Sequence, residues 1–406
     1  MHILVLDTIH GGKSIGEAYV SRGDQVDLVD VYRGEGPVSV ATALARTYDL
    51  IVAPVHLDPD HPLLKRATAP VITHHEAARQ LVGDITPTRM VEITGARGKT
   101  TTAHALASLI PGAGILHTSS GTYRFPEKNL ISRSSITPAS VLAAVKLARD
   151  LKGWLIAEES LGITGAGTLG IITSGEDYRF AADKKSAIEA KIASAGHCPH
   201  LLLAEKIPTP ARNGIVHLED AASCKGTECT IVLDGTTHRF TNPLLALPAY
   251  RDSLMLAATA AVMLGIDPAP LASFTALAGR MATRYDGRTL VVDNANSGTN
   301  AGTTIDAAQY ARNLSGTGAV TLVIGQQEGD GAVCEGFPHD QMLAAVETIR
   351  PVHLVWVGRA PDPGIPGTTG PAPQTTARVE TLEEGYTLAK QMTKQGSIVL
   401  AVKTWR

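Results

Sequence analysis

Residues 91–103 read VEITGARGKTTTA, and this stretch decides how the rest of the chain is interpreted. The apolar residues at its start predict a buried strand, and TTTAHALASLI after the glycines predicts a helix. A glycine turn between a strand and a helix presents backbone N–H groups and the positive end of the helix dipole to an anion. We therefore interpret the stretch as a phosphate-binding loop, the alternative being an ordinary turn of an α/β sheet.

The glycine spacing of this loop is shorter than that of the common nucleotide-binding pattern. The pattern G-x-x-x-x-G-K-[ST] requires a glycine five places before Gly98, where this chain has Ile93, and its first glycine is instead Gly95. Lys99 is placed to reach the β- and γ-phosphates, and the Thr100 hydroxyl is placed to coordinate Mg²⁺. The predicted nucleotide-binding residues of the loop are Thr94, Gly95, Ala96, Arg97, Gly98, Lys99, Thr100 and Thr101.

Length and composition indicate a multidomain globular protein. The chain has 406 residues, which at roughly 150 residues per domain suggests two or three domains. Its net charge of −3 gives no reason to expect nucleic acid or a membrane surface as a partner, and no apolar run reaches the ~18 residues of a membrane span. A signal-peptide pattern is absent, and the four cysteines form no metal-ligand array. These observations predict a cytoplasmic protein with reduced thiols at Cys198, Cys224, Cys229 and Cys334.

Strand-like and helix-like stretches alternate along the whole chain, which favours an α/β fold with parallel sheets. The breakers in GDITPT end a first segment, and LAGRM at 277–281 marks a second boundary. We predict a Rossmann-like N-terminal domain over 1–86, a central nucleotide-binding domain over 87–279 and a C-terminal α/β domain over 280–406.

The spacing T-G-x-x-G-K-T, from Thr94 to Thr100, resembles the Mur ligase family, whose loop reads T-G-T-N-G-K-T. The resemblance covers most of the chain in layout, but only short motifs in residues. It implies a three-domain Mur-ligase-like architecture with an N-terminal substrate domain, a central P-loop ATPase domain and a C-terminal α/β domain. It also implies that ATP and Mg²⁺ convert a carboxylate into an acyl phosphate, which a nucleophile then attacks.

Further positions match motifs of that family. GWLIAEES supplies Glu158 and Glu159 as metal ligands. Neighbouring strand residues point to opposite sides, so only one should be the main ligand, and we favour Glu158 by its position after the strand. Lys191 matches a helical lysine that many Mur ligases carbamylate, Arg280 matches an arginine that clamps the γ-phosphate, and Asp293 matches a residue near the ribose or the metal. The alternatives are an exposed acidic strand end for Glu158, a solvated helical lysine for Lys191 and a surface arginine for Arg280. The expected catalytic set is Lys99, Glu158, Lys191 and Arg280.

The chain also departs from the family pattern. Tyr178 stands where the family has a histidine that serves a second metal, and a phenol is a poor Mg²⁺ ligand at neutral pH. Arg251 and Leu254 stand where the family has asparagines beside the adenine, so no adenine contact is carried over. These departures predict a divergent branch of the family.

The first segment resembles the coenzyme F(430) synthetase branch of methanogenic archaea, in DTIHGG at 7–12 and VDVY at 29–32. In that branch ATP activates a propionate of a nickel tetrapyrrole, and a carbon of the same macrocycle closes the last carbocyclic ring. The resemblance implies a polycarboxylate substrate. Ligands bind at the carboxyl ends of parallel strands, so we place His10, Gly11 and Gly12 at the substrate, the alternative being that His10 caps the next helix.

A polycarboxylate also requires cationic partners. The segment at 118–138, TSSGTYRFPEKNLISRSSITP, is expected to be a loop that holds substrate carboxylates through Arg124, Lys128 and Arg133, the alternative being a solvated loop. Two other functions remain open. One is a Mur-type ligase that joins an amine or amino acid to a carboxylate. The other is a P-loop switch or transport ATPase, against which the chain lacks N-K-x-D and L-S-G-G-Q and has two flanking α/β domains.

Overall fold

The computed structural model describes residues 1–34, 36–83, 86–87, 89–209, 212–327, 336–358 and 373–404, so Cys334 lies outside the described residues. The chain divides into two compact units, Met1–Phe274 and Thr275–Arg406. In the part that is described, no helix is both long and apolar enough to cross a membrane. The division of the first unit at residue 86 stays a prediction, although two separate sheets lie on either side of it.

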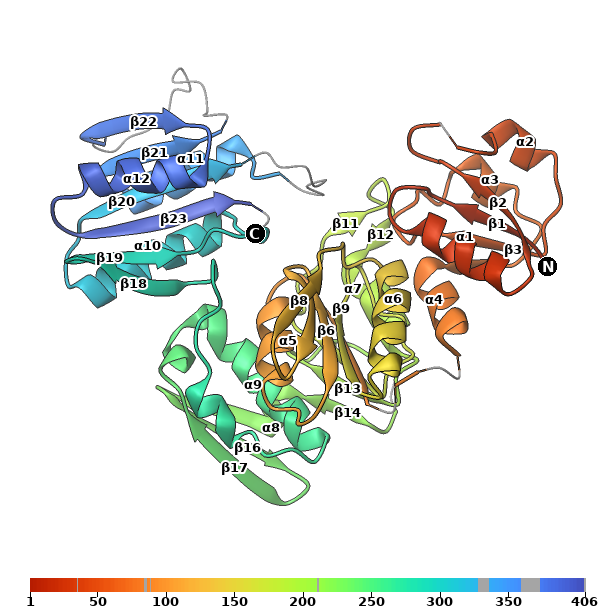
Figure 1. Ribbon diagram of the computed structural model, residues 1–406, viewed down its shortest axis with the longest axis horizontal. Coiled ribbons are helices and arrows are strands. Elements are labelled where there is room, and N and C mark those ends of the chain that lie inside the picture. The colour runs from red at the N-terminus through yellow and green to blue at the C-terminus, as the bar shows by residue number, and fades with distance from the viewer. Residues whose placement is uncertain are drawn as a thin grey trace. The chain divides into compact units, whose positions relative to one another are not determined.

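The first sheet of unit 1 is parallel, with the order β2-β1-β3-β4 (Figure 1). The inner strand β1 is almost wholly buried, because Ile3, Leu4, Val5 and Leu6 pack against helices and loops on both faces of the sheet. The strands are β1 (His2–Leu6), β2 (Gln25–Val29), β3 (Leu50–Ala53) and β4 (Val71–Thr73), and the helices are α1 (Gly12–Ser21), α2 (Val40–Leu44), α3 (Pro62–Lys65) and α4 (His74–Val82).

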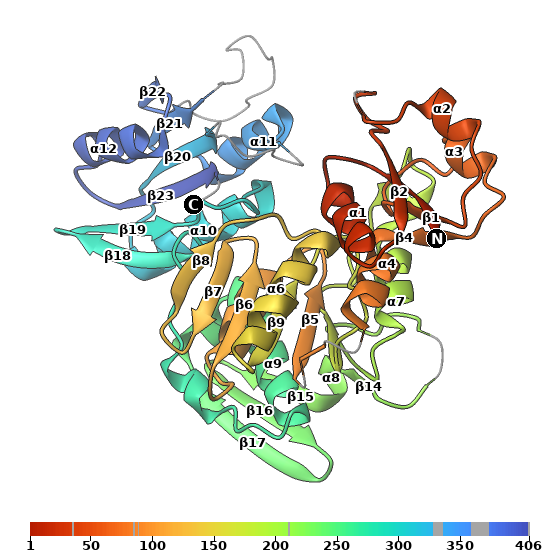
Figure 2. The same ribbon diagram turned by 45° about the vertical axis from the view of Figure 1, so that its right-hand side comes forward.

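An eight-stranded sheet forms the centre of unit 1, with the order β14-β13-β10-β5-β9-β6-β7-β8. Its strands are parallel except for the β6–β7 and β7–β8 pairs. Figure 2 shows α6 lying across one face of this sheet. The elements are β5 (Met90–Thr94), α5 (Lys99–Ala107), β6 (Gly114–Thr118), β7 (Gly121–Phe125), β8 (Asn129–Ser132), α6 (Pro138–Asp150), β9 (Trp154–Glu158), β10 (Leu169–Ile172), α7 (Ala187–Ala195), β13 (His200–Leu203), β14 (Ile215–His217) and α8 (Leu218–Ala221).

Two small sheets complete unit 1. The hairpin β11 (Arg179–Phe180) and β12 (Lys185–Ser186) precedes α7. A three-stranded antiparallel sheet contacts α9 (Pro248–Met263), which also packs against α5. Its elements are β15 (Ala222–Lys225), β16 (Glu228–Leu233) and β17 (Thr236–Thr241), followed by the 3-10 helices η2 (Pro243–Ala246) and η3 (Ala269–Ser273).

Unit 2 is a second α/β fold around a six-stranded sheet, with the order β18-β19-β23-β20-β21-β22. All of its strand pairs are parallel except β18–β19. The elements are β18 (Ala282–Asp286), β19 (Thr289–Asp293), α10 (Ala301–Ser315), β20 (Val320–Gln326), α11 (His339–Ile349), β21 (His353–Val357), β22 (Thr375–Val379), α12 (Leu382–Met392) and β23 (Ser397–Lys403).

The expectation of a loop over residues 118–138 is wrong. Residues 121–125 and 129–132 form the antiparallel strands β7 and β8 at one edge of the eight-stranded sheet. Tyr123 and Phe125 alternate with the polar residues Thr122 and Arg124, which is a strand pattern, and the many hydroxyl and charged residues of the segment obscured it.

Gly12 begins α1 under a tight steric constraint. A Cβ atom at this position would lie 1.9 Å from the carbonyl oxygen of Asp7, because the loop after β1 folds back onto the helix start. Only glycine leaves room for that backbone approach. The packing of the loop therefore accounts for Gly12, while its contact with a substrate stays a prediction.

We expect Gly12→Ala to destabilise the protein, because the new methyl group forces the loop after β1 to move. The loss in the free energy of unfolding should be about 1–3 kcal/mol, in the range of other overpacked sites. Thermal and urea unfolding followed by circular dichroism would measure it. Gly16→Ala is the matched control, since its Cβ would meet only side-chain atoms, Val26 Cγ1 at 3.3 Å and Leu28 Cδ1 at 4.0 Å. Equal unfolding midpoints for the two variants would contradict this account.

Candidate active site

The loop between β5 and α5 has a backbone shape that requires both of its glycines. Gly95 has a φ of +147° and Gly98, the N-cap of α5, has a φ of +82°. A Cβ at Gly95 would lie 2.2 Å from Thr173 Oγ1, because the loop presses against the end of β10. The short glycine spacing noticed in the sequence thus matches a loop that turns tightly over the neighbouring strand.

Two hydroxyl residues after β10 hold this loop in place. Ser174 Oγ accepts a hydrogen bond from the Ala96 N–H at 3.0 Å, and Thr173 Oγ1 donates to the Arg97 carbonyl at 2.5 Å. The sequence interpretation did not include either residue. The sequence does show a polar Thr-Ser pair at the end of the apolar run GTLGIITS, which could have indicated residues near the site. The structure places this pair beside the phosphate loop because β10 pairs directly with β5.

Lys99, Thr100 and Glu158 come together at the start of α5. Thr100 Oγ1 donates to Glu158 Oε2 at 2.8 Å, and the Ser119 N–H donates to the same oxygen at 3.1 Å. Lys99 Nζ donates to the Gly95 carbonyl at 3.0 Å and lies 3.9 Å from Glu158 Oε1. Glu158 is only 2% exposed. A buried carboxylate, a hydroxyl and an ammonium group therefore surround the N-terminal end of α5.

The same oxygens fit a small divalent cation. Neighbouring ligands of an octahedral Mg²⁺ with bonds near 2.1 Å lie about 2.9 Å apart. The Thr100 and Glu158 oxygens are 2.8 Å apart. The donor set is oxygen only, as Mg²⁺ prefers.

The expectation that Glu159 also binds the metal needs correction. Glu159 follows β9 and its carboxyl group is fully buried beside Glu92, whereas Glu158 faces Thr100. Burial, and then the neighbouring Glu92 carboxylate, raises the pKa of Glu159 well above its usual value. Glu92 accepts hydrogen bonds from the Thr164 and Gly167 N–H groups at 3.0 and 2.8 Å. Burial thus favours the protonated form of Glu159, and Glu158 is the carboxyl group that faces Thr100.

Lys191 is buried rather than solvated. It lies on α7 with a fully covered side chain, and its Nζ is 5.1 Å from the centroid of the Tyr178 ring. Within the described part of the chain, its amine has no hydrogen-bond partner. Burial, and then the positive charge of Lys99, lowers the pKa of Lys191 to about 8. The neutral fraction of this amine near physiological pH is therefore larger than that of an exposed lysine, although the charged form still predominates.

Arg97 faces outward from the loop. Its Nε donates to Glu176 Oε1 at 2.5 Å, and its Nη1 lies 3.9 Å from Asp252 Oδ2. The side chain is 56% exposed. Arg97 therefore ties the phosphate loop to the segment after β10 and to the start of α9.

The other predicted nucleotide residues belong to unit 2. Asp293 ends β19, is 6% exposed and accepts a hydrogen bond from the Ala295 N–H at 3.1 Å. The Arg280 N–H donates to the Leu277 carbonyl at 3.0 Å. The roles of Arg280 and Asp293 at the nucleotide stay predictions.

The predicted substrate residues fall into two groups in unit 1. His10, Gly11 and Gly12 lie after β1, and the N-cap of α1 is Gly11 without a side-chain cap, so the alternative that His10 caps this helix is wrong. Arg124, Lys128 and Arg133 are exposed on or beside the β7–β8 hairpin, and Arg124 Nε lies 3.9 Å from Glu127 Oε2. Their contact with substrate carboxylates stays a prediction.

Comparisons with known proteins identify the chains that this one resembles. Residues 283–404 match the family described as Coenzyme F430 synthetase CfbE, C-terminal domain. The chain is 29% identical to the Coenzyme F(430) synthetase of Methanosarcina acetivorans, across 100% of this chain and 98% of the relative. It is 24% identical to the Coenzyme F(430) synthetase of Methanocaldococcus jannaschii, across 47% of this chain and 49% of the relative.

Solved structures show the fold. MurF from Acinetobacter baumannii aligns with a TM-score of 0.55 and 14% identity, covering 97% of this chain and 95% of that chain. A bifunctional folylpolyglutamate synthase/dihydrofolate synthase, solved with Mn, AMPPNP and L-glutamate, aligns with a TM-score of 0.55 and 14% identity, covering 82% and 90%.

The chain has the Mur ligase fold. Its similarity to the coenzyme F(430) synthetase of Methanosarcina acetivorans extends over its whole length. These findings confirm the predicted α/β fold class and the family resemblance that the loop at 94–100 indicated.

The buried carboxyl pair predicts a stability that depends on pH. A raised pKa in the folded state means that Glu159 holds a proton which the unfolded chain releases above the usual glutamate pKa of 4.5. Glu159 therefore favours the folded state most below that pH, and its contribution falls as pH rises. Glu159→Gln stays neutral at every pH, so its midpoint of thermal unfolding relative to wild type should increase from pH 5 to pH 8.

The control for this prediction is Glu17→Gln, which changes an exposed carboxylate on α1. Its difference from wild type should stay nearly constant over the same range. A Glu159→Gln difference that does not change with pH would contradict the assignment of a protonated Glu159.

Proposed function

We propose that this protein is an ATP-dependent ligase that closes the last carbocyclic ring of coenzyme F(430). The observation that carries the proposal is the similarity to a coenzyme F(430) synthetase over the full length of the chain. The Mur ligase fold and the group formed by Lys99, Thr100 and Glu158 support the use of Mg-ATP. The proposed substrate is a nickel seco-tetrapyrrole that carries several carboxylates.

The proposed reaction has two steps. An oxygen of a propionate carboxylate attacks the γ-phosphorus of ATP, which forms an acyl phosphate and releases ADP. A carbon of the same macrocycle then loses a proton and bonds to the acyl carbon, and the C–O bond to phosphate breaks. The products are the new ring, ADP and phosphate, with the proton passing to solvent or phosphate.

The residues of unit 1 supply charge and position rather than a covalent nucleophile. In this proposal, Lys99 offsets negative charge on the transferring phosphoryl group, while Thr100 and Glu158 hold Mg²⁺. Bound Mg²⁺ supplies charge neutralisation at the β- and γ-phosphates. Arg280 and Asp293 are proposed to bind the nucleotide, and Arg124, Lys128 and Arg133 to bind substrate carboxylates.

The alternative function is an amide ligase, because MurF shares this fold and a ligase of that kind joins a carboxylate to an amine. The two functions differ in whether an external amine is required. A ring closure within one molecule requires none, whereas amide formation releases phosphate only when an amine is present.

We expect phosphate release from ATP with a nickel seco-tetrapyrrole alone, and Lys99→Ala should lower kcat by roughly 10²–10³-fold, as for other lost charge-stabilising groups. A coupled phosphate assay, with mass spectrometry of the product, would measure both. Lys146→Ala, which removes an exposed lysine of α6, is the matched control and should retain full activity. Phosphate release that depends on an added amine would overturn the proposal in favour of the amide ligase.

We further propose that Lys191 is carbamylated, as the family resemblance implied. Its neutral amine would bond to the carbon of CO₂, lose a proton and become a carbamate with two oxygens available to metal. The buried position and the pKa of about 8 support this reaction, because only the neutral amine reacts.

Carbon-13 NMR of the protein in ¹³C-bicarbonate should therefore show one carbamate resonance that Lys191→Arg removes. The signal should grow as pH rises towards 8, since the neutral fraction of the amine increases. Lys146→Ala should keep the signal. A resonance that survives in Lys191→Arg would show that another amine carries the carbamate.

A further inference from the structure

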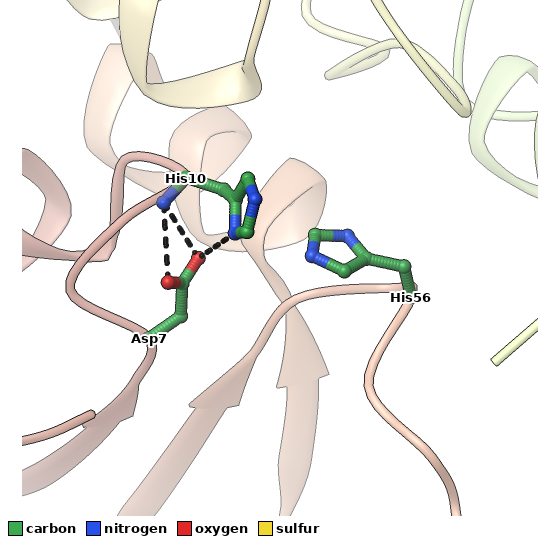
Figure 3. Close-up of side chains that lie close together, drawn as sticks. All are labelled: Asp7, His10 and His56. Atoms are coloured by element: carbon green, nitrogen blue, oxygen red, sulfur yellow. Dashed lines mark hydrogen bonds and ion pairs between the residues drawn. The ribbon is translucent and has the colours of Figure 1, made fainter. Parts of the chain in front are cut away.

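A cluster of two histidines and one aspartate lies at the carboxyl edge of the first sheet. Asp7 follows β1 directly, His10 precedes α1, and His56 comes from the loop after β3 (Figure 3). Strands β1 and β3 are parallel neighbours, so their carboxyl ends meet at the same edge. This is the edge at which α/β sheets bind ligands.

The three side chains converge on one point. One ligand atom from each residue lies within 4.8 Å of the other two. His10 Nδ1 is 3.2 Å from Asp7 Oδ2, and the His10 and His56 ring centroids are 4.7 Å apart at an interplanar angle of 86°. His56 Nε2 is buried and has no hydrogen-bond partner among the described residues. A buried imidazole nitrogen without a partner is costly unless a ligand satisfies it.

The surrounding structure fixes Asp7. Its Oδ1 accepts a hydrogen bond from the Ile9 N–H at 2.7 Å, and its Oδ2 accepts one from the His10 N–H at 3.0 Å. These bonds set the orientation of the carboxylate before any ligand arrives. They also leave lone pairs on both oxygens, since a carboxylate accepts about four hydrogen bonds.

The loop that carries His56 is held from two sides. The Tyr32 ring stacks on the His56 ring with centroids 5.7 Å apart and an interplanar angle of 17°. Lys185 Nζ donates to the Val55 carbonyl at 2.9 Å, and Lys184 Nζ donates to Asp58 Oδ1 at 2.6 Å. His56 therefore approaches the cluster on a restrained loop, as a binding site requires.

The donor set selects the class of ligand. Two imidazoles and one carboxylate suit Ni²⁺, Co²⁺ and Zn²⁺, whereas Mg²⁺ takes oxygen ligands. Bonds of about 2.0–2.1 Å place neighbouring ligand atoms roughly 3.3 Å apart in a tetrahedral site. Ligand atoms that are now up to 4.8 Å apart would therefore move closer by at most about 1.5 Å on binding. The Lys99–Thr100–Glu158 group has the opposite, oxygen-rich chemistry, so the two sites would select different metals.

We propose that Asp7, His10 and His56 bind a first-row transition-metal ion, with imidazole nitrogen as the dominant donor. Two sources can present such an ion, namely the free divalent ion and the nickel at the centre of a tetrapyrrole substrate. The second source rests on the proposed function, and the first does not. The experiment therefore has one arm for each source.

The first arm measures binding of Ni²⁺ alone to the untagged full-length protein by titration calorimetry, with excess Mg²⁺ and no nucleotide. We expect one saturable ion per chain. His56→Ala and Asp7→Asn should each weaken the affinity by roughly tenfold or more. Asp7→Asn keeps an oxygen that accepts from the Ile9 N–H, so the loop should stay folded, which circular dichroism would verify. His339→Ala, an exposed histidine on α11, is the matched control and should bind Ni²⁺ like wild type.

The second arm follows the visible absorption of a nickel seco-tetrapyrrole as protein is added. A band shift that His56→Ala removes and Lys99→Ala retains would identify the tetrapyrrole nickel as the source. Saturable Ni²⁺ binding that the variants weaken, without such a shift, would identify the free ion. The proposal is overturned if His56→Ala and Asp7→Asn change neither Ni²⁺ affinity nor the spectrum. Loss of cyclase activity with intact Ni²⁺ binding would bear on the proposed function alone.

Discussion

The candidate active site depends on how closely the loop at 95–98 packs over β10. Strands β5 and β10 are paired neighbours, so the backbone that leaves β5 must turn directly above the residues that leave β10. That turn leaves no space for a side chain at Gly95 and brings Thr173 and Ser174 into hydrogen-bond contact with the loop. The direction of α5, and with it the positions of Lys99 and Thr100, follows from this packing. On the other side of β5, β9 brings Glu158 to the same point.

The local parts of this site could be predicted from the sequence, whereas its long-range parts could not. The strand, turn and helix around the phosphate loop lie within a few residues of each other, so spacing and glycine content define them. The alternation of side chains along a strand predicted that Glu158 and Glu159 point to opposite sides, and the structure places the two carboxyl groups accordingly. Ser119, Thr173 and Ser174 reach the site only through strand order, which no short motif encodes.

Other differences between the predictions and the structure also come from pairing and packing between residues that are distant in the sequence. The β7–β8 hairpin was taken for a loop because its polar residues suggested solvent contact, while pairing at the sheet edge satisfies its backbone. Burial of Lys191 follows from the packing of α7 and Tyr178 around it, and a helical lysine alone gives no sign of that. The meeting of His10 and His56 depends on β1 and β3 being neighbours, because 46 positions separate the two histidines in the sequence.

One segment, from Ser174 to Lys191, contacts both functional regions of unit 1. At its start, Ser174 and Glu176 bond to the phosphate loop, and near its end Lys185 bonds to the loop that carries His56. The same stretch of backbone then continues into the helix of Lys191. Its contacts to the phosphate loop and to the loop after β3 are hydrogen bonds and ion pairs, which are directional and short in range. One continuous stretch of backbone therefore links the phosphate loop, the loop that carries His56 and the helix that carries Lys191.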